Sequence, residues 1–249
     1  MTLRPVLLIR PSDNDVDREA LSQRGIPSHE CPLLRVSTVA DPSGARVLLD
    51  HVAPGAWVVA ASGNAIRSWA ELVGADSLRL ALSTGVEFAA VGESSARALQ
   101  SVGARDVVIP SHTNAAALAD ELVERQAVGV AIIPKGNLAM STLPAVLETS
   151  GWRVFSEVVY TITEIDDEPP ILGRVADGEF SAVVVRSPSA ARAMARWIDT
   201  TSLPVVCAGE TTAAAVRQIG LPVAAIARSS RPADVADAVH MVVTRVESR

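Results

Sequence analysis

Residues 92–103 read GESSARALQSVG, and residues 209–220 repeat the phrase as GETTAAAVRQIG. In both copies a glycine follows a short apolar stretch, hydroxyl side chains come next, and apolar residues then recur at helical spacing. Each copy ends on a glycine, the residue that most often stops a helix. The pattern predicts, twice, a strand, a glycine turn, a helix with hydroxyl residues at its start, and a stop at Gly103 or Gly220.

Further pairs of segments extend this repeat over most of the chain. They are WVVAASGNAIRSW (57–69) with AVVVRSPSAARAM (182–194), NAAALADEL (114–122) with PADVADAV (232–239), and LLIRPSDN (7–14) with IIPKGNLA (132–139). The last pair puts Arg10 opposite Lys135, and Gly25 and Gly151 each close the helix that follows. Strands that alternate with helices predict parallel sheets built from crossover units. The chain is therefore predicted to contain two copies of one α/β half.

The repeat alone allows two arrangements of the domains. A cut near residue 127 gives two contiguous domains, whereas packing of the first unit with the last three makes one domain discontinuous. In the second arrangement PLLRVST (32–38) and EVVYTIT (157–163) become crossing linkers. The segment DDEPPILGRVADGEF (166–180) interrupts the rhythm with acidic residues and two prolines, so it is predicted to be mainly surface loop.

Composition excludes several classes of protein. The chain has 249 residues, 49% of them hydrophobic and 20% charged, which favours a folded core over disorder. A net charge of −6 disfavours a general nucleic-acid binder. The apolar runs are shorter than the roughly 20 residues of a membrane helix, and the N-terminal run reads as a strand rather than a signal peptide. Only two cysteines, Cys31 and Cys207, indicate a reduced, cytoplasmic protein, and Cys207 is predicted to be a core residue.

Hydroxyl and amide side chains stand at four predicted helix starts. One interpretation is N-capping, which satisfies the backbone N–H groups that have no intrahelical partner. The other is functional, because these turns lie at the carboxyl ends of parallel strands, where helix N-termini favour anions. Together they indicate a site for a ligand with several carboxylates or phosphates. The residues are Ser62 and Asn64, Ser94 and Ser95, Ser187 and Ser189, and Thr211 and Thr212.

Conventional catalytic and cofactor motifs are missing from the sequence. GxGxxG and GxxxxGK[ST] do not occur, PKGN (134–137) is too short for a P-loop, and ASGNA lacks the nucleophile-elbow pattern. The four histidines have no metal-binding spacing, so no metal and no cofactor are expected. The acidic residues Asp13, Asp15, Asp17 and Glu19 are predicted to form a solvated first helical turn.

Tyr160, the only tyrosine, lies in a candidate linker strand. It is interpreted either as a half-buried strand aromatic with its hydroxyl at the surface or as a residue that faces a ligand, and both interpretations stay open.

A set of short motifs occurs in one order along the chain. They are IRP (9–11), SGNA (62–65), VGESSARAL (91–99), PKGNLAMSTL (134–143), VVYTI (158–162), SPSA (187–190) and GETTAAA (209–215). This ordered set resembles the uroporphyrinogen-III synthase family over nearly the whole chain. Lys135 stands where the family has Arg. Arg186 stands where it commonly has Thr or Ser before SPS, and Ala61 replaces the usual Thr before SxNA.

The resemblance implies a fold and a domain division. The expected fold is α/β, with two similar parallel-sheet domains (flavodoxin-like, HemD-like) joined by a two-stranded β linker, and with a cleft between them. Domain 1 would combine residues 1–34 and 164–249, and domain 2 would span residues 38–157. The linkers would be about 32–38 and 157–164.

The resemblance also implies an activity. The expected enzyme is a lyase of tetrapyrrole and haem biosynthesis that cyclises hydroxymethylbilane to uroporphyrinogen III, with inversion of ring D and loss of water, and it needs no cofactor. Its substrate would be a linear tetrapyrrole polycarboxylate, with no nucleic-acid or membrane partner, and a transient contact with hydroxymethylbilane synthase is a further expectation. The protein would be cytoplasmic, and nothing in the sequence requires more than a monomer.

Site residues follow from matching the family's motifs position by position. Tyr160 is the expected catalytic residue. The expected substrate-binding residues are Arg10, Ser62, Gly63, Asn64, Gly92, Ser94, Ser95, Lys135, Gly136, Ser187, Pro188, Ser189, Gly209, Thr211 and Thr212. The sequence leaves two alternatives open, namely a non-enzymatic two-lobed protein that binds or senses small anions and a nucleotide-using transferase.

Overall fold

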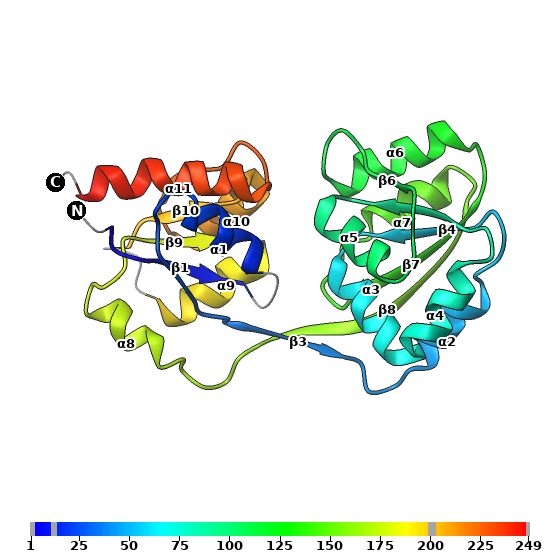
Figure 1. The fold of residues 1–249 in the computed structure, drawn as a ribbon, viewed down its shortest axis with the longest axis horizontal. Coiled ribbons are helices and arrows are strands. Elements are labelled where there is room, and N and C mark those ends of the chain that lie inside the picture. Colours follow the sequence, from blue (N-terminus) through cyan, green and yellow to red (C-terminus); the bar gives the residue numbers. More distant parts are fainter. Residues whose placement is uncertain (1–2, 11–13, 199–202, 248–249) are drawn as a thin grey trace. The chain divides into compact units, whose positions relative to one another are not determined.

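The structure is a computed structural model that describes residues 3–10, 14–198 and 203–247, with the side chains of residues 246 and 247 left out. The chain divides into two compact units (Figure 1). Unit 1 comprises Met1–Arg35 and Thr163–Arg249, and unit 2 comprises Val36–Ile162. The chain therefore starts in unit 1, builds all of unit 2, and returns to complete unit 1.

Unit 1 is organised around a parallel sheet. Among the described residues this sheet has five strands in the order β11-β10-β9-β1-β2. β1 is hydrogen-bonded to β9, with Val6 opposite Ala182 and Ile9 opposite Val185, so the start of the chain shares a sheet with its C-terminal third. The strands are β1 (Val6–Ile9), β2 (Ser28–Glu30), β9 (Ala182–Val185), β10 (Val205–Cys207) and β11 (Val223–Ile226).

Helices pack on this sheet through small and branched residues. α11 and α1 lie side by side and bury an apolar stripe against β1, β9 and β10, while α9 packs against α10. Figure 1 shows α11 as the long red helix of this unit. The helices are α1 (Asp15–Ser22), α8 (Ile171–Ala176), α9 (Pro188–Trp197), α10 (Glu210–Gln218) and α11 (Pro232–Glu247).

The segment 166–180 is mainly loop, as predicted, but it also contains a short helix that the sequence analysis did not predict. It contains α8, whose N-cap is Pro170, and it anchors itself through the buried side chains of Leu172 and Phe180. A proline at the start of a helix costs no intrahelical hydrogen bond and presets the backbone angle. The paired prolines therefore start a short helix here, which the composition of the segment obscured.

Unit 2 is described throughout, and its sheet has six strands in the order β3-β8-β7-β4-β5-β6. The pairings among β4, β5, β6, β7 and β8 are parallel. β3 runs antiparallel to β8, because Val39 N donates to Val159 O and Ile165 N donates to Leu33 O, both at 3.2 Å. The strands are β3 (Leu34–Thr38), β4 (Trp57–Ala60), β5 (Glu87–Ala90), β6 (Val107–Val108), β7 (Val130–Gly136) and β8 (Arg153–Glu164).

The two segments in which the chain passes from one unit to the other contain β3 and β8, which are neighbouring strands of the unit 2 sheet. β8 pairs with β7 from Arg153 to Tyr160 and lies beside β3 on its other side. Two apolar clusters cover the faces of the unit 2 sheet, one beneath α2, α3, α4 and α5, and one beneath α6 and α7. The helices are α2 (Ser43–Asp50), α3 (Gly63–Val73), α4 (Ala75–Leu82), α5 (Glu93–Ser101), α6 (Ala115–Arg125) and α7 (Thr142–Thr149).

The repeat in the sequence is a repeat in the fold. In the matched segments, β9, β10, β11 and β1 of unit 1 correspond to β4, β5, β6 and β7 of unit 2. With this correspondence, the order β11-β10-β9-β1-β2 in unit 1 is the same as the order β6-β5-β4-β7-β8 in unit 2. Gly103 and Gly220 follow their helices at φ +104° and +80°, the left-handed region that glycine tolerates best. The predicted α/β fold with two similar parallel sheets is confirmed.

Candidate functional site

Two of the predicted helix starts are capped by serine. α3 follows β4, and α9 follows β9. Ser62 Oγ accepts a hydrogen bond from Asn64 N at 3.2 Å, and Ser187 Oγ accepts one from Ala190 N at 3.1 Å. Ser187 Oγ also lies 3.1 Å from Ser189 Oγ. For these two serines the N-cap interpretation is confirmed, and the helix ends that they cap point their remaining N–H groups out of the helix.

The other two helix starts use glycine. α5 is capped by Gly92 and α10 by Gly209, neither with a side-chain hydrogen bond. The hydroxyl residues after them lie within the first helical turn, so the N-cap interpretation is wrong for Ser94, Ser95, Thr211 and Thr212. Both glycines have extended backbone angles that any residue adopts. A Cβ on Gly209 would meet nothing within 4 Å, so the space beside the start of α10 is open, whereas a Cβ on Gly92 would lie 3.5 Å from Thr113 Cγ2.

The starts of neighbouring helices lie close together within unit 2. A Cβ on Gly63, at the first turn of α3, would lie 3.3 Å from the main-chain oxygen of Ser94 in α5. α9 and α10 are neighbours in the same way in unit 1. Each unit thus presents two adjacent helix N-termini beyond the carboxyl ends of two adjacent strands, which is where parallel α/β folds bind ligands.

Tyr160 joins the start of α3 to the end of β7. The residue is 6% exposed, and its hydroxyl donates to Ser62 Oγ at 3.2 Å. Tyr160 is therefore buried rather than half-buried, and its hydroxyl has a hydrogen-bond partner within unit 2. The ring lies directly on Gly136, since a Cβ there would come within 2.5 Å of Tyr160 Cζ. Three residues predicted from separate motifs, Ser62, Gly136 and Tyr160, thus form one cluster in unit 2.

Asn137 holds this cluster in place, although the sequence did not single it out. Its main-chain N–H donates to Tyr160 O at 3.1 Å, its Oδ1 accepts from Ile162 N at 2.8 Å, and its Nδ2 donates to Ile162 O at 3.3 Å. The β7–β8 register shifts between Lys135 and Gly136, which brings Gly136 opposite Tyr160. The sequence signal for this role of Asn137 is its position directly after PKG (134–136), which ends a strand.

Unit 1 carries charged groups at the corresponding strand ends. Arg10 follows β1 directly, and Arg186 follows β9 directly. Both guanidinium groups face Asp17 of α1, with Arg186 Nη1 2.9 Å from Asp17 Oδ1 and Arg10 Nη1 3.7 Å from Asp17 Oδ2. The Asp17 side chain is only 3% exposed, so the predicted solvated acidic turn is wrong at this position. Asp13 lies outside the described residues.

Burial shifts the acid–base behaviour of several groups. Desolvation lowers the pKa of the Arg186 guanidinium, the nearby Asp17 carboxylate opposes that change, and the Arg10 charge adds to it. Cys31 and Cys207 are buried free thiols, as predicted for Cys207, and burial raises the pKa of each to about 11. Both thiols are therefore protonated at neutral pH and poor nucleophiles.

The described part of the chain contains no cluster of three or more histidine, cysteine or acidic side chains placed to hold a metal ion. Over the same residues, no helix has both the length and the apolar character that crossing a bilayer requires.

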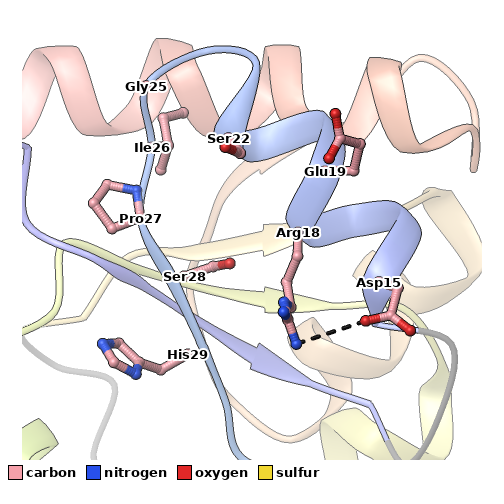
Figure 2. Close-up of a pocket in the computed structure, with 9 residues that line it drawn as sticks. All are labelled: Asp15, Arg18, Glu19, Ser22, Gly25, Ile26, Pro27, Ser28 and His29. Atoms are coloured by element: carbon pink, nitrogen blue, oxygen red, sulfur yellow. Dashed lines mark ion pairs between the residues drawn. The ribbon is translucent and has the colours of Figure 1, made fainter.

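A hollow of about 710 Å³ lies in unit 1 between α1 and β2 (Figure 2). Its cation Arg18 is 3.6 Å from Asp15 and 3.0 Å from Glu30. The predicted site residues are not among its lining. The lining residues are Asp15, Arg18, Glu19, Ser22, Gly25, Ile26, Pro27, Ser28 and His29.

These features define a class of protein, a duplicated α/β fold with paired helix starts, a cluster of charged side chains and a buried tyrosine at its strand ends. The model of the uroporphyrinogen-III synthase HemD family matches residues 15–237, so the chain belongs to this family. Enzymes of this family cyclise hydroxymethylbilane, a lyase reaction of haem biosynthesis on a small tetrapyrrole. The alternative of a non-enzymatic sensor is not favoured.

Solved structures with the same fold include two bacterial enzymes. The uroporphyrinogen-III synthetase of Helicobacter pylori is 16% identical with a TM-score of 0.64, over 96% of this chain and 99% of that one. A mutant uroporphyrinogen III synthase of the extremely thermophilic bacterium Thermus thermophilus is 17% identical with a TM-score of 0.60, over the same shares of the two chains. No curated protein matches the sequence.

Proposed function

We propose that the Tyr160 hydroxyl assists loss of the substrate's hydroxyl group, and that helix starts and cations in each unit bind the substrate's carboxylates. The observation that carries this proposal is the hydrogen bond from Tyr160 to Ser62 Oγ at the N-terminus of α3. A buried phenol beside an anion-binding helix start can donate a hydrogen bond to an oxygen that develops negative charge.

The first step breaks the C–O bond of the hydroxymethyl group. Electrons of the pyrrole nitrogen form the exocyclic double bond of an azafulvene, and the departing hydroxide and the pyrrole N–H proton together make water. In the resting geometry the Tyr160 proton is held by Ser62 Oγ. On substrate binding the hydroxyl turns to the departing oxygen, and Ser62 Oγ keeps its hydrogen bond from Asn64 N, so this oxygen still has a partner.

The later steps need the correct conformer more than further acid–base groups. The substituted carbon of the last ring attacks the azafulvene, and the spiro intermediate fragments and recloses with that ring inverted. Because the unassisted reaction gives the non-inverted isomer, the protein's contribution is to hold one folded conformer of the bilane. Backbone N–H groups at the starts of α3, α5, α9 and α10 would hold its carboxylates, and Arg10 and Lys135 would add positive charge.

The proposed binding residues combine both units. They are Arg10, Ser62, Gly63, Asn64, Gly92, Ser94, Ser95, Lys135, Gly136, Ser187, Pro188, Ser189, Gly209, Thr211 and Thr212. The functional domains are proposed to be residues 1–34 with 164–249 and residues 38–157, with linkers at about 32–38 and 157–164. Two buried free thiols fit a reducing compartment, so we also propose that the protein works in the cytoplasm. A transient contact with hydroxymethylbilane synthase is a separate proposal.

Isomer analysis tests the reaction. The protein is incubated with freshly generated hydroxymethylbilane, and the products are oxidised to porphyrins and separated. The expected result is enrichment of the type III isomer over a protein-free control. A product that is all type I, together with tight binding of the bilane, would contradict the proposal and favour a ligand sensor.

A further inference from the structure

The loop that follows β7 exposes three consecutive apolar residues, 138–140, which we call the apolar loop. Leu138 is 52% exposed and Met140 is 72% exposed, and Ala139 between them is exposed as well. Isolated exposed apolar residues are ordinary, but a run of three is unusual unless it has a function. In the part of the chain that the structure describes, the large apolar residues that are exposed are Val47, Leu80, Val128, Leu138, Met140 and Met241.

The repeat shows that this apolar run belongs to unit 2 only. In the matched segments Asp13 stands opposite Leu138, and the same alignment puts Asp15 opposite Met140. The copy in unit 1 therefore has acidic residues where the copy in unit 2 has apolar ones. Polar residues are typical of a turn that only connects a strand to a helix. The connection itself therefore does not explain why apolar residues stand in unit 2.

Hydrogen bonds and packing hold the apolar loop at both of its ends. Before it, Asn137 N donates to Tyr160 O at 3.1 Å, and within it Ala139 N donates to Gly136 O at 3.1 Å. After it, α7 begins, and Leu143 of that helix is buried against the unit 2 sheet. The backbone of the apolar loop is therefore ordered before any ligand binds, so that binding costs little backbone entropy.

The apolar loop also lies close to the Tyr160 ring. The ring packs on Gly136, where a Cβ would come within 2.5 Å of Tyr160 Cζ, and Leu138 follows two residues later. A chain extends by at most about 3.5 Å per residue, so the Cα atoms of Gly136 and Leu138 are within about 7 Å of each other. Exposed apolar side chains therefore begin two residues from the glycine on which the proposed catalytic tyrosine packs.

We propose that Leu138 and Met140 bind an apolar ring face of the tetrapyrrole substrate beside Tyr160. This inference rests on the proposed function. A bilane has carboxylates at its edges, but its pyrrole faces and methylene bridges are apolar. Helix starts and cations can bind only the carboxylates, whereas a ring face packed on these two side chains removes apolar surface of both partners from water. Methionine suits this role because its side chain is adaptable and its sulfur packs well against aromatic rings.

The competing occupant of the apolar loop is a second copy of this chain. Two copies that cover each other's exposed apolar residues would also remove them from water. The two explanations differ in what a polar substitution changes. It weakens tetrapyrrole binding if the loop contacts the substrate, and it changes the oligomeric state if the loop contacts a second copy.

The experiment measures the Kd for uroporphyrin III by fluorescence titration. The variants are Leu138→Gln, Met140→Gln and the double variant, because glutamine keeps the length of the side chain but makes it polar. The matched control is Leu80→Gln, since Leu80 is 73% exposed in the same unit but lies in α4, which begins at Gly74 where α3 ends.

We expect the Kd to rise about fivefold in each single variant and about 20-fold in the double variant, and to stay within about twofold of the parent value in Leu80→Gln. These ratios should be the same at about 0.05 M and about 0.5 M salt, because salt screens charges and not apolar contacts. The thermal midpoint should stay near the parent value, since the substituted side chains are exposed.

A Kd within about twofold of the parent value in the double variant overturns the proposal, as does a parent protein that does not bind uroporphyrin III. If the double variant does not fold, the single variants decide by the same criterion. A parent dimer that the double variant loses, seen by analytical ultracentrifugation with the Kd unchanged, overturns it in favour of a second copy. The expected Kd values in a protein that forms no type III isomer would refute the proposed function and leave the apolar contact standing.

Discussion

The two units have the same strand order and the same pair of serine-capped helices, but they differ in what stands beside the caps. In unit 2 the residue before Ser62 is Ala61, and the nearby side chain is the uncharged Tyr160, whose hydroxyl is bonded to that serine. In unit 1 the residue before Ser187 is Arg186, which is paired with Asp17. A duplicated backbone thus keeps its N–H groups in position while the side chains diverge in charge.

This difference separates two physical tasks. Buried ion pairs are costly to desolvate and costly to disrupt, so they suit a fixed anchor. A neutral hydrogen bond between two hydroxyls is exchanged at low cost, so it suits a group that must turn to a reacting oxygen. We therefore propose that Tyr160 of unit 2 assists bond cleavage and that Arg10 of unit 1 contributes to anchoring only, alongside the helix starts of both units. Each role can be tested separately.

Neutralising the Asp17 carboxylate in unit 1 should have the largest effect, which is a loss of stability of this unit. Asp17→Asn leaves two guanidinium groups without their shared carboxylate and should lower the free energy of unfolding of unit 1 by about 3 kcal/mol. Both cysteines lie in unit 1, so the rate at which a thiol reagent modifies them reports on this unit. The control Asp76→Asn, in an exposed pair of unit 2, should leave the unfolding midpoint unchanged. Unchanged thiol protection in Asp17→Asn would contradict the cluster.

The second-largest effect is expected from a methyl group placed under the Tyr160 ring in unit 2. Gly136→Ala places a Cβ within 2.5 Å of Tyr160 Cζ, so the ring must move away from Ser62. We expect the rate of type III formation to fall about 100-fold, equivalent to about 2.7 kcal/mol. Gly173→Ala in α8, where a Cβ meets nothing within 4 Å, is the control and should keep the parent rate. A loss below about threefold in Gly136→Ala would show that the ring position does not matter.

Removing the tyrosine hydroxyl should have a somewhat smaller effect. Tyr160→Phe keeps the ring on Gly136 and deletes only the donor, so turnover should fall about 30-fold, or about 2 kcal/mol. Ser62→Ala should lose about fivefold, since the helix N–H groups remain in place. Steady-state rates of type III formation provide the comparison. Equal losses in the two variants would remove the special role of Tyr160.

Alkaline pH should weaken unit 1 selectively. Burial raises the pKa of Cys31 and of Cys207 from 9.0 to about 11, so the folded state holds these protons more tightly than the unfolded state does. The contribution of these two thiols to the free energy of unfolding is complete below about pH 9. It is lost as the pH rises from there to about 11, by ~1 to 2 kcal/mol per thiol. Denaturation followed by tryptophan fluorescence, which comes mostly from unit 2, should shift less than denaturation followed by thiol reactivity. Replacing both cysteines with alanine should remove the loss of stability between about pH 9 and 11, measured by chemical denaturation followed by circular dichroism.

The sequence predicts the fold well because its signals are local. Glycine stops such as Gly103 and Gly220 and the repeated strand–helix units are readable from neighbouring residues, and the repeat predicts that the two units are built alike. What the sequence hides are pairings between distant positions. Asp17 is interpreted as a solvated acid until Arg186 is known to face it. The hydrogen bond from Tyr160 to Ser62 and the shifted β7–β8 register likewise join residues that are distant in the sequence.

The helix starts show a similar limit at shorter range. Ser62 and Ser94 both follow a strand, yet only Ser62 is a cap, because Gly92 takes that position in α5. The sequence therefore identified the right turns without distinguishing a side chain that closes the helix from one that lies inside it.

Saturation kinetics of type III formation, measured side by side for Tyr160→Phe and Arg10→Gln, test the division of tasks most directly. We expect Tyr160→Phe to lower kcat with KM near the parent value, and Arg10→Gln to raise KM about 10-fold with kcat near the parent value. The opposite pattern, or the same change in both parameters for both variants, would contradict the division of tasks between the two units.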